Sequence, residues 1–147
     1  MIIKTISLKE VEYTAFRLAK ELMTWDEPIP DFGTRYPNIL ESCIGAPFQT
    51  FYSKPLYKKL TGKAAILFYL MVKNHPFEDG NKRIAVMTLF VFLFRNRKWL
   101  RVTNEGLYKF AVGIAKSKPR LKDKYIAHIE AFLNKNLVDY YPHKPRM

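Results

Sequence analysis

The chain has 147 residues and a net charge of +12, with 25 Lys and Arg against 13 Asp and Glu. Such a balance attracts nucleic acid, nucleotide phosphates or acidic proteins without choosing among them, and solubility alone would also explain it. The length favours one domain over residues 1–147. The single cysteine, Cys43, excludes an internal disulfide and favours the cytoplasm. The apolar runs are shorter than the ~20 residues that span a bilayer, which argues against a membrane protein.

The first predicted helix covers about residues 8 to 24. Ser7 and Glu10 match a capping box, in which each side chain bonds the backbone N–H of the other residue. Apolar residues then recur at helical spacing: Leu8, Val11, Ala15, Leu18, Ala19 and Leu22. The Pro- and Gly-containing stretch 25–35 reads as a loop, and we expect a short helix near 37–43.

Residues 44–52 have a different character. Gly45 and Pro47 break a helix, and the aromatic residues after them favour extended backbone, so we expect an exposed hairpin or flap. A connecting loop whose aromatic side chains fill the core is an equally weighted alternative. Pro55 suits the first turn of a following helix, which Gly62 weakens.

Two apolar helices should follow, over residues 63–74 and 81–96. The second is apolar almost all round, which is typical of a helix in the middle of a bundle. Thr103 is a good N-cap for a further helix, and residues 121–136 carry the last one. We therefore predict an all-α fold of six or seven helices around one buried helix, with a loose C-terminal tail from about residue 140.

The loop between the two apolar helices carries the chemistry. Gly80 directly precedes a helix, whose first N–H groups lack partners and whose dipole end is positive, so it predicts an anion site. Glycine also allows close approach of a ligand to the backbone. Lys82 and Arg83 add side-chain charge suited to phosphate.

Two further residues of this loop complete a possible reaction site. Asp79 offers a hard oxygen for Mg²⁺, which usually accompanies nucleotide phosphates. His75 can take a proton from a hydroxyl near neutral pH. Each residue alone has a structural explanation, as a cap, a turn residue or a solvated charge, and Phe77 is best explained as a core anchor. Only their joint spacing favours phosphoryl or nucleotidyl transfer.

The run His75-Pro76-Phe77-Glu78-Asp79-Gly80-Asn81-Lys82-Arg83 resembles the Fic/Doc signature, His-x-Phe-x-(Asp/Glu)-Gly-Asn-(Gly/Lys)-Arg, with every fixed position filled. The similarity is clear from about residue 38 to 100. It implies a Fic-type helical bundle around a central helix, with a short β-hairpin flap that docks the target. It also implies roles for the loop: His75 as general base, Asp79 for Mg²⁺, Phe77 as anchor, and Gly80, Asn81, Lys82 and Arg83 around the phosphates of ATP.

The residue at position 82 separates two activities within this family. Members with Gly there transfer AMP to protein hydroxyls, whereas Doc-type members carry Lys and resemble kinases that transfer the γ-phosphate of ATP. The known target of the Doc type is a threonine of a translation elongation factor. Lys82, together with Val86 where AMP-transferases usually carry a second Arg, favours a Doc-type protein kinase toxin, with AMP transfer as the alternative.

The family resemblance also implies a partner. The inhibitory motif Ser/Thr-x-x-x-Glu-Gly/Asn found within some family members is absent, so a separate Phd-like antitoxin is expected. A basic RNA-binding or nuclease module is a rival interpretation, but Arg120 and His128 do not have the spacing typical of helical nucleases, and nucleic acid is not an expected partner. A binding domain without catalysis is the second rival, although no fixed position of the motif is damaged.

Overall fold

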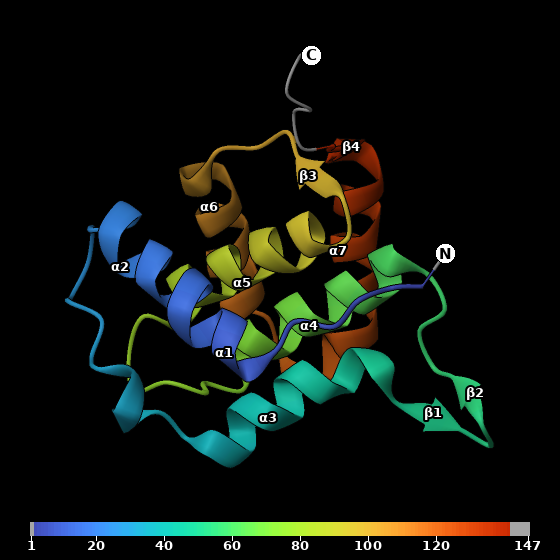
Figure 1. Cartoon of the computed structure of the whole chain (residues 1–147), viewed down its shortest axis with the longest axis horizontal. Coiled ribbons are helices and arrows are strands. Elements are labelled where there is room, and N and C mark those ends of the chain that lie inside the picture. The colour runs from blue at the N-terminus through green and yellow to red at the C-terminus, as the bar shows by residue number, and fades with distance from the viewer. Residues whose placement is uncertain (1, 142–147) are drawn as a thin grey trace, which may run out of the picture.

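The computed structural model describes residues 2–141 and has the predicted all-α fold. Helices α4 (Leu60–Lys73) and α5 (Asn81–Arg95) run in opposite directions through the middle of the molecule (Figure 1). Most of α5 is buried, and its core positions are Ile84, Ala85, Val86, Met87, Leu89, Phe90, Phe92 and Leu93. The prediction of a central apolar helix is therefore confirmed. Among the helices of residues 2–141, none is both long enough and apolar enough to cross a bilayer.

The N-terminal helical segment comprises α1 (Leu8–Glu10), a π-helical stretch (Val11–Phe16) and α2 (Arg17–Leu22). The capping box is present as predicted, with both reciprocal bonds formed between Ser7 and Glu10. The wider π turn rotates every later residue around the axis. The simple helical spacing is therefore wrong at its end, where Leu22 is 54% exposed and Met23 is buried.

A loop with one 3₁₀ turn (Phe32–Thr34) leads to α3 (Pro37–Gly45) and then to an antiparallel hairpin of β1 (Thr50–Phe51) and β2 (Lys54–Pro55). A hairpin is present as predicted, but it covers residues 50–55, and the first part of the predicted stretch 44–52 belongs to α3 and a 3₁₀ turn (Ala46–Phe48). The alternative that the aromatics fill the core is wrong for Phe51 and Tyr52, which are 63% and 87% exposed, whereas Phe48 packs against the core. The predicted helix start at Pro55 is also wrong. Pro55 pairs with Thr50 on a two-stranded ribbon, where its missing N–H is tolerated.

The hairpin lies at the N-terminal end of α4, where Lys63 Nζ donates to the carbonyl of Pro47 at 2.9 Å. The His75 loop follows the other end of α4, about 20 Å away at 1.5 Å per helical residue. Figure 1 shows the two at opposite sides of the molecule. The hairpin is therefore too far from the His75 loop to cover it.

The C-terminal part contains β3 (Lys98–Leu100), α6 (Asn104–Ala115), α7 (Lys122–Asn136) and β4 (Leu137–Asp139). Thr103 caps α6 as predicted, accepting from the N–H of Gly106 at 2.9 Å. The antiparallel pair β3–β4 was not predicted. The N–H of Tyr140 donates to the carbonyl of Arg97, so the chain is still held in place at residue 140. Tyr141 is exposed, and residues 142–147 of the predicted loose tail lie outside the described residues.

Both ends of α5 are hydrogen-bonded to residues that flank the N-terminal helical segment. At the C-terminal end, the Asn96 amide accepts from the N–H of Lys4 at 2.7 Å and donates to its carbonyl at 2.9 Å. At the other end, Arg83 bonds three carbonyls of the loop that follows α2. The start of α5 is thus built from two distant parts of the chain.

Candidate functional site

The loop between α4 and α5 is pinned by one aromatic side chain. Phe77 is 3% exposed and packs against Phe16 and Phe32, with ring centroids 5.7 and 5.8 Å away. His75 and Asp79, on either side of it, are exposed. The predicted anchor role of Phe77 agrees with this packing, which fixes the loop while its polar side chains face solvent.

Asn81 holds the loop from the first position of α5. Its Oδ1 accepts from the N–H of Phe77 at 2.9 Å, and its Nδ2 donates to the carbonyl of Phe77 at 2.8 Å. The same Nδ2 lies 3.4 Å from Nδ1 of His75, which has a left-handed backbone with φ +50°. The amide side chain is therefore engaged in shaping the loop and orienting the imidazole.

Gly80 is the N-cap of α5, with φ +77°. A β-carbon there would lie 2.7 Å from Cγ1 of Ile29, so glycine is required both by the backbone and by this neighbour. No side chain caps the helix, and the N–H groups of its first turn have no acceptor within the helix. The predicted anion donors are thus present, although Ile29 covers the face of Gly80 where a Cβ would stand.

Arg83 is only 4% exposed, and its guanidinium faces the loop after α2. It donates to the carbonyls of Met23 (3.2 Å), Trp25 (2.8 Å) and Glu27 (2.6 Å). These bonds show Arg83 as a clamp on that loop. Its predicted contact with phosphate stays a prediction.

A small hollow of about 20 Å³ lies at this end of α5, lined by Asp26, Asp79, Gly80, Lys82, Arg83 and Tyr108. Four of these residues were predicted from the motif, and Arg83 borders the hollow as well as holding the loop. No pattern in the sequence pointed to Asp26 and Tyr108, which lie 82 positions apart. The Tyr108 hydroxyl donates to Asp26 Oδ2 at 2.6 Å, and burial, with this bond, raises the pKa of Tyr108.

The metal prediction rests on Asp79 alone. Its Oδ1 accepts from the N–H of Gly80 at 2.7 Å, and the side chain is exposed. Within residues 2–141, no three His, Cys, Asp or Glu side chains gather to hold an ion. One carboxylate suits Mg²⁺ that keeps its waters and shares nucleotide oxygens, so the residues fit a nucleotide-borne ion better than a protein cage.

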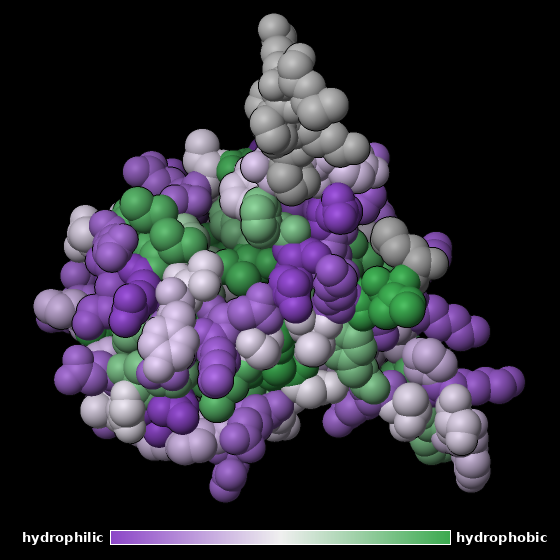
Figure 2. Space-filling model, viewed as in Figure 1, coloured by the Kyte–Doolittle hydropathy of each residue, from purple (hydrophilic) through white to green (hydrophobic). Residues whose placement is uncertain are grey.

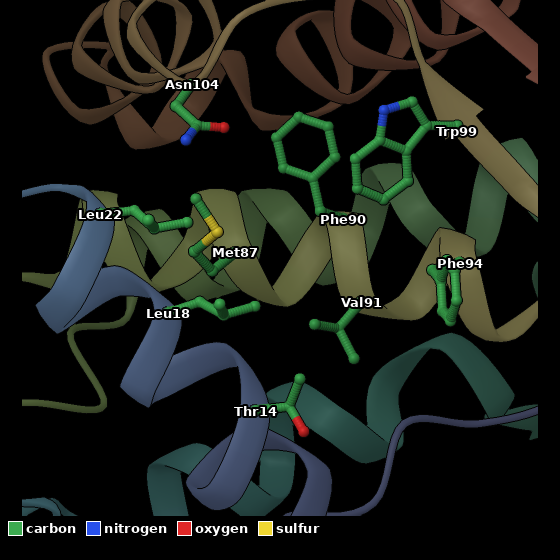
Figure 3. A pocket seen from close by; sticks show the side chains of 9 residues that line it. All are labelled: Thr14, Leu18, Leu22, Met87, Phe90, Val91, Phe94, Trp99 and Asn104. Carbon is green, nitrogen blue, oxygen red and sulfur yellow. The ribbon is translucent and has the colours of Figure 1, made fainter.

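A larger cavity lies elsewhere. A groove of about 480 Å³ lies between α2, α5 and β3, with Leu18, Leu22, Met87 and Phe90 along its floor and Trp99 at one end (Figure 3). Figure 2 shows hydrophobic surface between α2 and α6 on this face. The groove shares no lining residue with the hollow at Gly80 and has no charged side chain, so it does not supply the chemistry predicted for the loop.

Comparison with known proteins places the loop in a wider context. A family model described as the Fic/DOC family matches residues 7–93, from the capping box to the last turn of α5. A curated relative, the Toxin Doc of Mycolicibacterium smegmatis, is 36% identical over 58 residues, which are 40% of this chain and 45% of the relative. The match thus spans less than half of that relative. No solved structure matches the chain.

Proposed function

The chain belongs to the Fic/DOC family, and from that membership we propose that it transfers the γ-phosphate of ATP to a Ser or Thr hydroxyl of a target protein. One observation carries the proposal. An exposed imidazole, His75, and an uncapped helix N-terminus at Gly80 occur on one loop that Phe77 and Asn81 hold in place. Base and anion donors are thus preorganised on neighbouring turns.

In the proposed reaction, His75 takes the proton of the target hydroxyl. The hydroxyl oxygen then bonds the γ-phosphorus, the bond from that phosphorus to the β,γ-bridging oxygen breaks, and ADP leaves. A positioned general base contributes roughly 10²–10⁴ in rate.

The phosphates are held by the start of α5 in this proposal. The free N–H groups of Asn81 and Lys82, and the Lys82 ammonium, would bind phosphate oxygens. Asp79 would supply a carboxylate oxygen to Mg²⁺, which when bound with ATP offsets charge on the phosphates. Lys82 is half-exposed and borders the hollow, where its cation can reach an anion at the helix start.

Transfer of phosphate rather than AMP is supported by two residues. Lys82 occupies a position where a glycine would leave more room for phosphates. Val86 stands where AMP-transferases of the family usually carry a second Arg, and its side chain is completely buried in the core. Val86 therefore presents no charged group to a nucleotide, so we favour the kinase over AMP transfer.

The relative's name supports a toxin, and we propose that the chain is a toxin of the Doc type. From the family resemblance we further propose that its target is a translation elongation factor and that a Phd-like antitoxin restrains it, both in the cytoplasm. Expression in a bacterial host should then stop protein synthesis. The arrest should disappear with His75→Ala and persist with His128→Ala, since His128 is exposed on α7, away from the motif.

The direct test uses a bacterial lysate with purified protein and ATP labelled at either the γ- or the α-phosphate. Label on a protein band from γ-labelled ATP alone supports the kinase, and label from α-labelled ATP supports AMP transfer instead. The His75→Ala variant should lose the label while still binding nucleotide, and His128→Ala should keep it. Binding without label from either nucleotide, in the presence of an elongation factor, would contradict both transferase activities.

A further inference from the structure

A second cavity adjoins the hollow at Gly80. It has a volume of about 330 Å³ and is lined by Lys20, Met23, Thr24, Asp26, Pro28, Ile29 and Arg83. Asp26 and Arg83 line both spaces, so the two are neighbours at these residues. The hollow itself holds little more than one water-sized group, so a phosphate chain would lie across its mouth and lead into the larger cavity.

The walls of this larger cavity combine the groups that a nucleoside needs. Met23, Pro28 and Ile29 supply apolar surface for the flat face of a base, while Lys20 and Thr24 supply hydrogen-bonding groups. Its volume lies at the lower end of the roughly 300–1,000 Å³ typical of small-molecule sites. Two further polar residues, Asp26 and Arg83, line both the cavity and the hollow, and a ribose would lie beside Asp26, between base and phosphates.

Asp26 is held in a fixed position. The Tyr108 hydroxyl donates to its Oδ2, and Oδ1 has no hydrogen bond from any side chain or backbone group of residues 2–141. Its backbone is left-handed, with φ +67°. The three bonds from Arg83 to the carbonyls on either side of it keep the loop in this shape. One carboxylate oxygen thus remains free to accept from a sugar hydroxyl.

We propose that the cavity between the end of α2 and the loop 23–29 holds the nucleoside of the substrate nucleotide, with Asp26 accepting hydrogen bonds from the ribose hydroxyls. This inference rests on the proposed nucleotide-dependent function. The proposal also gives the nucleotide a direction, with the phosphates extending past Gly80 toward Asn81, whose Nδ2 lies 3.4 Å from Nδ1 of His75. With the nucleoside beyond Asp26 and the phosphates across Gly80, the terminal phosphate is the one closest to His75, as γ-transfer requires.

The test compares binding of Mg-ATP with binding of Mg-tripolyphosphate, which lacks the nucleoside, by calorimetry on the full chain. Thr24→Trp fills the cavity from an exposed position, and Thr50→Trp, on the exposed hairpin, is the matched control. We expect Thr24→Trp to weaken Mg-ATP at least tenfold and to leave Mg-tripolyphosphate within about twofold. Thr50→Trp should change neither. Circular dichroism checks that both variants are folded.

The role of Asp26 is tested with an ATP analogue that lacks both ribose hydroxyls. The wild-type chain should prefer ATP over 2′,3′-dideoxy-ATP, and Asp26→Asn should lose most of that preference. Asp31→Asn, in the same loop and exposed, should keep it. Equal weakening of ATP and tripolyphosphate by Thr24→Trp, or ATP binding that it leaves unchanged, overturns the nucleoside site alone. A wild-type chain that binds neither compound overturns the proposed function as well.

Discussion

Ile29 lies directly against Gly80, so that Cγ1 of the isoleucine occupies space 2.7 Å from where a β-carbon would stand. This contact joins the loop after α2 to the N-cap of α5. Gly80 also has φ +77°, a region that L-residues rarely adopt. Two independent constraints therefore require glycine at the centre of the motif, before any ligand is considered.

Replacing Gly80 by alanine should consequently destabilise the fold. Left-handed backbone strain and the clash with Ile29 together should lower the free energy of unfolding by about 2–4 kcal/mol. Gly113→Ala is the control, since Gly113 lies within α6 with no neighbour near its Cβ position, and alanine there should stabilise by about 0.5–1 kcal/mol. Urea denaturation compares the two variants. A similar stability for both would show that Ile29 and the loop simply move aside.

Asn81 should contribute to the stability of the fold as well as to the proposed binding of phosphate. Asn81→Ala leaves the buried N–H and carbonyl of Phe77 without their partners, which should cost about 2–4 kcal/mol. Asn136→Ala removes a single amide bond to a helix carbonyl, that of Phe132, and should cost about 1 kcal/mol. Thermal and urea unfolding of both variants measure the difference. Equal losses would mean that the loop holds its shape without the amide.

Replacing Arg83 by lysine should make the loop after α2 less ordered. One ammonium cannot reach three carbonyls arranged for a planar guanidinium, so Arg83→Lys should raise hydrogen exchange across residues 23–30 and lower stability by about 2 kcal/mol. The control is Arg95→Lys. Arg95 pairs with Glu10 at the surface, where the change should stay within about 1 kcal/mol. Unchanged hydrogen exchange in residues 23–30 would show that Arg83 does not hold that loop in place.

Cys43 should be unreactive in the folded protein. Burial raises the pKa of its thiol from an ordinary value near 9 to about 11, and its side chain is fully packed. Iodoacetamide at pH 8 should therefore label it only after unfolding, as followed by mass spectrometry. The folded state keeps the proton up to about pH 11 and the unfolded state loses it near pH 9, so stability from this group falls as the pH rises between them. Rapid labelling of the native chain would contradict the burial.

Local patterns in the sequence predicted most of the fold. The start of α1 follows from the capping box at Ser7, and α6 follows from its cap at Thr103. Apolar spacing predicted α7, and all-round apolar character predicted α5, because such patterns depend on neighbours three or four residues away. The π turn in the first helix defeated the same argument, since it shifts the buried face without any breaker residue in the sequence. The pairing of β3 with β4 joins short strands about forty residues apart, and neither strand has enough alternation to identify it.

The site shows the same division between local and distant information. The motif identified His75, Asp79 and the helix start, because their order along the chain is itself the signal. The three hydrogen-bond acceptors of Arg83 could not be found in this way. Its acceptors are backbone carbonyls 56 to 60 positions earlier, and a carbonyl has no residue type to recognise. Asp26 meets Tyr108 only through packing of α6 against that loop.

The attachment of both ends of α5 to the first 27 residues has a consequence during synthesis. Residues 23–27 are synthesised about 60 residues before Arg83. At ~5–20 residues per second, this is an interval of several seconds. Throughout that interval Lys4 and the carbonyls at Met23, Trp25 and Glu27 lack the side chains that will later bind them. A nascent chain therefore cannot assemble the neighbourhood of Gly80, and any harmful activity must wait until α5 has been made.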